Sequence, residues 1–205
     1  RSVVGPDRYH RSMRRRLFES LHIAGSGVWL GALTMTAVTA AVAFPTMKAL
    51  APSLPQFKTD PAQHGIIAAG HVMQRVFLAC DVTQFICGML CFVGLGGLLA
   101  TTHAGRGNRL VMLLRTISTA AALMLLSYHL LMLAPRMNEN LRAYWDAALT
   151  GEAEAAAQFK SAFDADHPTA SRVLGATGVS VFFALLTGCW AATAPRRDDT
   201  AARGA

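Results

Sequence analysis

Residues 21–44 read LHIAGSGVWLGALTMTAVTAAVAF, a stretch without Asp, Glu, Lys or Arg. A helix needs about 20 mainly apolar residues to cross the ~30 Å hydrocarbon core of a bilayer. The basic residues 14–16 precede the stretch, as in a signal peptide, but the run is longer than the roughly 7–15 apolar residues of a signal. We interpret it as a first transmembrane helix, and we expect it to end at Pro45, because proline interrupts helical hydrogen bonding.

Three more apolar stretches predict three more spans, at about residues 71–100, 110–134 and 169–194. Pro135 follows the third, and residues 166–168 (Asp-His-Pro) provide a helix start for the fourth. The composition agrees, with 53% hydrophobic and 15% charged residues, where soluble domains are about one quarter charged. We therefore predict a single domain of the all-α class, an integral membrane four-helix bundle.

The segment 135–167 differs in composition from the spans. It is charged and alanine-rich, and residues 152–160 (EAEAAAQFK) favour a helix. It carries more acidic than basic residues, and Tyr144, Trp145 and Phe159 interrupt the charge. We predict a short helical segment outside the bilayer, between the third and fourth spans, which forms the main surface for a partner.

The basic residues beside the spans predict the orientation of the chain. The amino-terminal tail, the link 102–109 and the carboxyl tail are rich in arginine and lie on one side of a four-span bundle. The positive-inside rule places that side, and with it both termini, in the cytoplasm. Because topology accounts for these residues, the formal charge of +7 does not indicate nucleic-acid binding. We expect a multi-pass protein of the bacterial inner (cytoplasmic) membrane.

Several histidines are candidate ligands for haem b or a metal. His22 lies at the cytoplasmic end of the first span, and Ser26 and Trp29 share its helical face. His71 and His129 lie near the outer ends of the second and third spans, with His64 and His167 in the flanking segments. His22, or His71 with His129, would hold haem or copper, and His71, His129 and His167 would form a metal site. A hydrogen bond between helices is the alternative for each.

Three polar side chains fall inside apolar spans, where exposure to lipid is costly. Asp81 and Gln84 lie in the second span and Arg115 in the third. They face either protein or a wet path for a proton or solute. The antiparallel arrangement places Asp81 nearer the outer side and Arg115 nearer the inner side, so we expect no direct pair and name Arg75 as another partner for Asp81.

Small residues predict helix contacts. Cys80, Cys87 and Cys91 lie on one face of the second span and are best explained as small residues in a helix interface. Gly27 and Gly31 form a small-xxx-small pair, which allows helices to approach closely.

Residues 22–31 (HIAGSGVWLG), followed by Phe44 and Pro45, resemble the opening of several small bacterial membrane families: a histidine, small apolar residues, Trp-x-Gly and a distal proline. Over most of its length the chain resembles the four-helix family called domain of unknown function 4149, which is related to eukaryotic transmembrane-protein-205-like proteins. Residues 133–137 and 163–167 resemble later landmarks of that family. The resemblance implies a four-helix membrane fold.

The opening alone also resembles copper-resistance D membrane domains and HemJ-type protoporphyrinogen oxidases. In these families the corresponding histidine is thought to bind haem, so the resemblance implies that His22 is a ligand. The HemJ-type opening continues into a Leu-Pro-Arg-type stretch, and residues 31–36 (GALTMT) depart from it. This departure argues against the enzyme activity.

These observations favour a non-catalytic membrane subunit that contacts the lipid bilayer and other membrane proteins of a larger complex. The second hypothesis is a haem- or copper-binding membrane protein that uses His22, or His71 with His129. The third is a small transporter or channel, in which Asp81 or Arg115 lines the path.

Overall fold

A computed structural model of the chain describes residues 6–58, 61–101 and 109–193, and only the backbone of residues 6–12. All regular elements in these ranges are helices: α1 (Pro6–Leu50), the 3₁₀ turn η1 (Pro61–Gln63), α2 (His64–Thr101), α3 (Arg109–Tyr128), the π-helical turn η3 (His129–Leu133), α4 (Ala134–Thr150) and α5 (Ala153–Thr193). The carboxyl tail and the link 102–108, on which the predicted orientation partly rests, lie outside the described residues.

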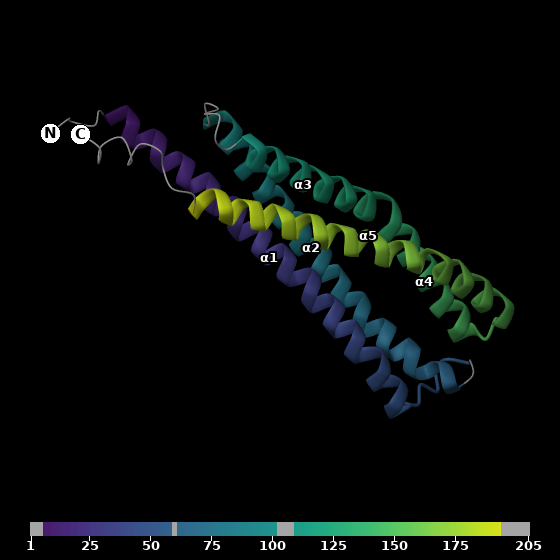
Figure 1. Cartoon of the computed structure of the whole chain (residues 1–205). Coiled ribbons are helices and arrows are strands. Elements are labelled where there is room, and N and C mark those ends of the chain that lie inside the picture. Colours follow the sequence, from purple (N-terminus) through teal and green to yellow (C-terminus); the bar gives the residue numbers. More distant parts are fainter. Residues whose placement is uncertain (1–5, 59–60, 102–108, 194–205) are drawn as a thin grey trace.

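The helices form two long antiparallel hairpins that lie against each other (Figure 1). One hairpin consists of α1 and α2. In the other, α3, η3 and α4 follow one another without a break as a single rod, and α5 packs along this rod. The predicted all-α four-helix bundle is confirmed. Below, the terminal end is the end with the start of α1 and the end of α5, and the hairpin end is the end with residues 51–58 and 151–152.

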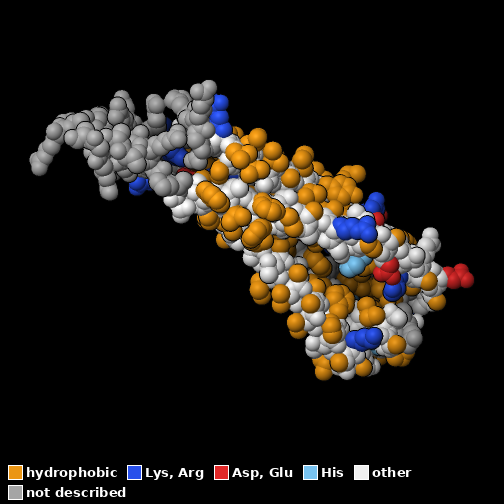
Figure 2. All heavy atoms as spheres, viewed as in Figure 1, with side chains coloured by type: hydrophobic (Ala, Val, Ile, Leu, Met, Phe, Trp, Pro, Cys, Tyr) orange, Lys and Arg blue, Asp and Glu red, His pale blue; other side chains and the backbone are white. Residues whose placement is uncertain are grey.

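The outer faces of the four rods are apolar. Each rod is long and apolar enough to cross a membrane. Large apolar side chains on the outside are mostly accessible, among them Met35 (62%), Phe92 (61%) and Leu131 (74%). Apolar side chains cover the middle of the bundle, and charged side chains gather towards its ends (Figure 2). A soluble monomer rarely exposes so much contiguous apolar surface, so the chain is a multi-pass membrane protein in contact with lipid.

Prolines do not end the helices where the sequence suggested. α1 passes through Pro45 to Leu50, and α5 begins at Ala153 and passes through Pro168. Both prolines lie on exposed faces, where the ring meets no neighbouring helix. Each removes one helical hydrogen bond, and we attribute the continued helix to packing beyond the proline. The segment 135–167 is therefore not a separate element, because it forms the hairpin-end parts of two rods.

Pro135 follows a π-helical turn in its rod. Just before it, residues 129–133 form a π turn, in which the N–H of Ala134 bonds to the carbonyl of His129, five residues back. A proline has no N–H to donate, and its ring clashes with the carbonyl four residues back. The wider turn accommodates this clash by inserting one extra residue into the helical path. The π turn thus offsets the register of α4 from that of α3.

A small core closes the hairpin end. It contains aromatic and aliphatic side chains from the loop after α1, from α2, from α4 and from α5: Phe57, Ile67, Tyr144, Trp145, Ala147, Ala148 and Ala156. The N–H of Lys58 donates to the carbonyl of Ala148 across 2.8 Å and ties the loop to α4. Gly151 ends α4 with φ of 86°, a left-handed conformation that glycine adopts without strain. The two hairpins are thereby joined at this end as well.

Candidate functional site

A cavity of about 710 Å³ lies in the hairpin-end half of the bundle. Side chains of α1, α2, α4 and α5 form its walls, together with His129 of η3. Most of the wall is apolar, as in Leu33, Phe77 and Leu174. The hollow is visible on the face in Figure 2, bordered by apolar side chains and by a few charged ones. Sites for small molecules are of this kind: concave, largely apolar, with a few polar groups.

Two polar residues of the cavity wall, Asp81 of α2 and His129 of η3, belong to a hydrogen-bonded network that extends into the bundle. Nε2 of His129 lies 3.0 Å from Oδ1 of Asp81. Nε2 of Gln84 donates to the same oxygen across 3.3 Å, and Nε1 of Trp29 donates to Oε1 of Gln84 across 3.1 Å. An indole N–H can only donate, so the Gln84 oxygen must face Trp29 and its NH₂ must face Asp81. The chain of contacts, which we call the Asp81 network, joins α1, α2 and η3.

A second polar cluster lies nearer the terminal end, and we call it the Arg115 cluster. NH1 of Arg115 forms an ion pair with Oε1 of Glu19 at 3.2 Å, and Nε of Arg115 donates to Nδ1 of His22 across 3.3 Å. Nε2 of His22 lies 3.0 Å from Oγ1 of Thr119. Because Nδ1 accepts a bond, the proton of a neutral His22 is on Nε2, which donates to Thr119. The cluster fastens α1 to α3.

An apolar layer separates the two polar groups. Its buried members come from all four rods: Trp29, Cys87, Cys91, Ala122, Leu126 and Val181. Cys87 and Cys91 lie on α2 between Gln84 and the level of His22, and Sγ of Cys91 is 3.4 Å from Oγ of Ser26. The three cysteines of the predicted stripe are free and buried, so they are packing residues of a helix interface.

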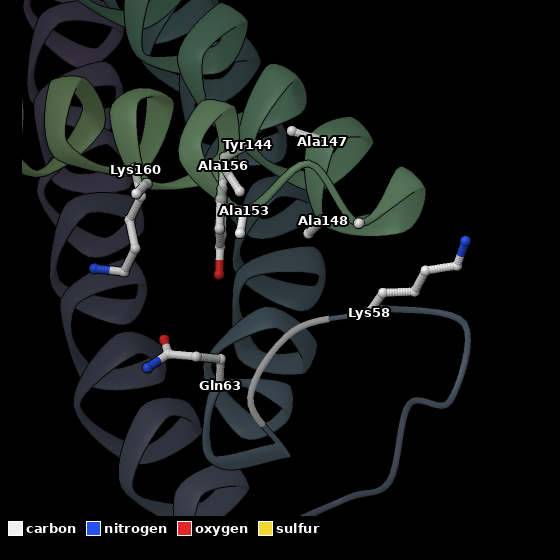
Figure 3. A pocket seen from close by; sticks show the side chains of 10 residues that line it. Lys58, Gln63, Tyr144, Ala147, Ala148, Ala153, Ala156 and Lys160 are labelled. Carbon is white, nitrogen blue, oxygen red and sulfur yellow. The ribbon is translucent and has the colours of Figure 1, made fainter.

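A smaller hollow of about 260 Å³ lies at the hairpin end, where α4 meets α5. The Tyr144 hydroxyl points into the space between Lys160 and Gln63, and Lys58 extends away from it (Figure 3). Tyr144 and Lys160 also line the larger cavity. Lys160 is held by Asp164, at 2.6 Å from its carboxylate. The hollow is therefore an adjoining recess, lined mainly by alanines, in which Lys160 already has an anionic partner.

The structure places the three intramembrane polar residues inside the bundle, but with partners that the sequence did not identify. Asp81 contacts His129 and not Arg75, and Arg115 contacts Glu19. Glu19 was missed because it lies before the apolar run, although it stands three residues before His22 on the same helical face. Trp29 and Thr119 were also not recognised as hydrogen-bonding partners. A helical wheel finds the shared face, and only the packing identifies the partner.

The predicted metal site does not form. His71 stacks on Trp145 with ring centroids 3.8 Å apart, and His167 packs beside Phe163. His129 is turned to Asp81. Among the residues that the structure describes, no three His, Cys, Asp or Glu side chains are placed to hold a metal ion. The three histidines of the predicted site thus contact three different neighbours, Trp145, Phe163 and Asp81.

His22 does not suit a haem iron in this arrangement. Iron needs a lone pair on a ring nitrogen. The Nδ1 lone pair of His22 accepts from Arg115, and Nε2 bears the proton that bonds to Thr119. The ring is fully buried between helices, and the guanidinium beside it would repel a metal cation. In this arrangement neither ring nitrogen of His22 offers a free lone pair to a haem iron, and haem or copper binding stays a prediction.

Gly27 and Gly31 make no close helix contact within the described chain, contrary to the packing role that we predicted. A Cβ atom added at either glycine would meet nothing within 4 Å. α1 and α2 approach closely at other glycines, among them Gly94, where an added Cβ would lie 2.9 Å from the backbone of His22 and Phe18, and Gly65, where it would lie 2.7 Å from the carbonyl oxygen of Met47. The rotation of α1 turns Gly27 and Gly31 to the outside of the bundle, where they remain open to lipid or to another helix.

The comparisons with known proteins identify no relative: no family model, no curated protein and no solved structure matches the chain.

Proposed function

We propose that this membrane protein binds a small, largely apolar molecule from the lipid phase in the cavity beside Asp81. The observation that carries the proposal is a cavity of about 710 Å³, large enough for a small molecule. Apolar side chains form most of its wall, and the hydrogen-bonded pair of Asp81 and His129 lines it as well. Typical small-molecule pockets enclose about 300–1,000 Å³. Figure 2 shows apolar side chains around the hollow, which suits entry of an apolar molecule from the bilayer.

The two ends of the bundle differ in a way that supports a carrier. The cavity occupies the hairpin-end half, and the apolar layer around Trp29 and the Arg115 cluster fill the other half. A solute in the cavity thus meets Asp81 and His129, and then a packed barrier. This arrangement is that of a carrier closed towards the terminal end, which corresponds to the small-transporter hypothesis from the sequence.

Saturable binding of lipophilic probes tests the proposal. We would measure equilibrium binding of three probes of similar shape, tetraphenylphosphonium, tetraphenylborate and tetraphenylsilane, to the full chain in lipid nanodiscs. The Gly178→Leu variant adds a side chain to the cavity wall, and Gly27→Leu adds the same side chain at an open site outside it. We expect at least one probe to bind saturably, with weaker binding to Gly178→Leu and unchanged binding to Gly27→Leu. No saturable binding of any probe, or equal effects of the two substitutions, would overturn the proposal.

A second candidate is a subunit of a larger membrane complex. The open face of α1 at Gly27 and Gly31 supports it, because small residues without neighbours let a helix of another protein approach closely. Native mass spectrometry of gently solubilised protein tests this role. We expect a complex that Gly27→Leu weakens. A monomer at all detergent concentrations would contradict it.

A further inference from the structure

Asp81 is one of the carboxylates of the cavity wall. The charged residues that line the cavity are Lys160, Asp81 and Asp164. Lys160 and Asp164 pair with each other at 2.6 Å, so their charges cancel. Asp81 has no Lys or Arg within ion-pair distance among the residues that the structure describes. Among the described lining residues, Asp81 is therefore the one carboxylate that is not paired with a Lys or Arg.

One oxygen of Asp81 is free to meet a ligand. The hydrogen-bond contacts of Asp81 with Gln84 and His129 are both made to Oδ1. Oδ2 accepts no hydrogen bond from the described residues, and it is not among the fully enclosed polar atoms without a partner. The side chain keeps 15% of its surface accessible and lies in the cavity wall. Gln84 and His129 thus hold the carboxylate through Oδ1, and Oδ2 is left without a hydrogen-bond partner among the described residues in a side chain that lines the cavity.

The aromatic side chains of the cavity wall favour a positively charged ligand. Aromatic side chains from all four rods line the cavity, namely Phe44, Phe77, Tyr144, Trp145 and Phe163. The faces of aromatic rings carry partial negative charge and attract cations. A carboxylate in apolar surroundings is poorly solvated and gains most from an opposite charge. A neutral apolar molecule would leave this free oxygen without a partner.

We propose that the ligand of this cavity is a lipophilic organic cation and that Asp81 is its counter-ion. The cation has an apolar body that fills the aromatic wall and a positive centre that lies against Oδ2 of Asp81. Gln84 and His129 act as positioning residues, because they hold the carboxylate by Oδ1. The inference rests on the proposed function, since it names the class of ligand for that same cavity.

The charge preference of the unaltered protein is the first test. Tetraphenylphosphonium and tetraphenylborate are similar in size and opposite in charge, and tetraphenylsilane is neutral. For the full chain in nanodiscs of uncharged lipid, with empty nanodiscs as the blank, we expect tetraphenylphosphonium to bind about tenfold or more tightly than either other probe. Equal or weaker binding of the cation than of the neutral or anionic probe would overturn the inference, and it would leave the binding function standing.

Substitution of Asp81 is the second test. In Asp81→Asn, which preserves the shape, we expect the preference for the cation to fall about tenfold or more, while binding of tetraphenylsilane stays unchanged. Asp146→Asn removes an exposed carboxylate of α4 outside the cavity, and it is expected to keep the preference. Asp81→Glu retains the negative charge, and we expect this variant to keep the preference for the cation. It provides a second measurement at this position if Asp81→Asn does not fold. A cation preference that persists in folded Asp81→Asn contradicts the assignment of Asp81.

Discussion

Arg115 donates its Nε–H to Nδ1 of His22 across 3.3 Å, and both side chains are almost completely buried. The contact joins α1 to α3 near the terminal end of the bundle. Among the described residues, the counter-ion of this arginine is Glu19, whose Oε1 is 3.2 Å from NH1. The other terminal nitrogen, NH2, is buried without a hydrogen-bond partner. The stability of this end of the bundle therefore depends on the ion pair between Arg115 and Glu19.

Glu19→Gln should destabilise the protein by about 2–3 kcal/mol, because it leaves the buried Arg115 charge uncompensated. Thermal unfolding in nanodiscs measures the loss. The double variant Glu19→Gln/Arg115→Met should recover part of it, since both charges are then absent. Asp164→Asn, which breaks the more exposed pair with Lys160, should change stability by about 0.5 kcal/mol or less. Additive effects of the Glu19 and Arg115 substitutions would contradict the coupling.

Trp29→Phe should cost about 1–3 kcal/mol, because the buried Gln84 oxygen loses its N–H donor inside the apolar layer. The loss is measured by unfolding as above. The matched control is Trp190→Phe, since Trp190 is 67% exposed on the outside of α5. Equal effects of the two substitutions would show that the Trp29–Gln84 bond adds nothing to stability.

Gly94→Ala should destabilise the contact between α1 and α2 by about 1–3 kcal/mol. The added methyl group would lie 2.9 Å from the backbone nitrogen of His22 and from the carbonyl oxygen of Phe18, and these atoms cannot give way without moving α1. Gly27→Ala meets open space, and it should leave stability unchanged or raise it slightly, since alanine favours helix. If Gly94→Ala is as stable as Gly27→Ala, the two helices do not approach as described.

Pro135→Ala should remove the reason for the π turn at residues 129–133, because residue 135 regains an N–H and loses the ring. The part of the rod after the turn then rotates by roughly 100° relative to the part before it. Spin labels at Leu114 and Leu149, which are both exposed, measure this rotation as a change in distance distribution by pulsed electron paramagnetic resonance. Pro168→Ala in α5 is the control and should leave the distance unchanged. An unchanged distance in Pro135→Ala would mean that packing alone maintains the turn.

The sequence by itself determined the number of rods and the solvent around them. Four apolar runs, each long enough for a bilayer, suffice for this, because hydropathy is a local property that adds up along the chain. Burial of Asp81, Gln84 and Arg115 followed in the same way, since a polar side chain in a span avoids lipid. The free, buried cysteines also agreed with their predicted role in packing.

Only the tertiary structure decided which of these side chains meet. The rotation of α1 turns His22 towards Arg115 and turns Gly27 outward, and no count of apolar residues determines such a rotation. His129 continues the buried face of α3, and the packing of α2 against this face brings it to Asp81, a partner that helical spacing alone does not identify. The contact partner of a side chain depends on the crossing angle and register of two helices, whereas the position of a membrane span depends on the composition of one helix alone. The cavity beside Asp81 exists for the same reason, because it is formed where two hairpins meet.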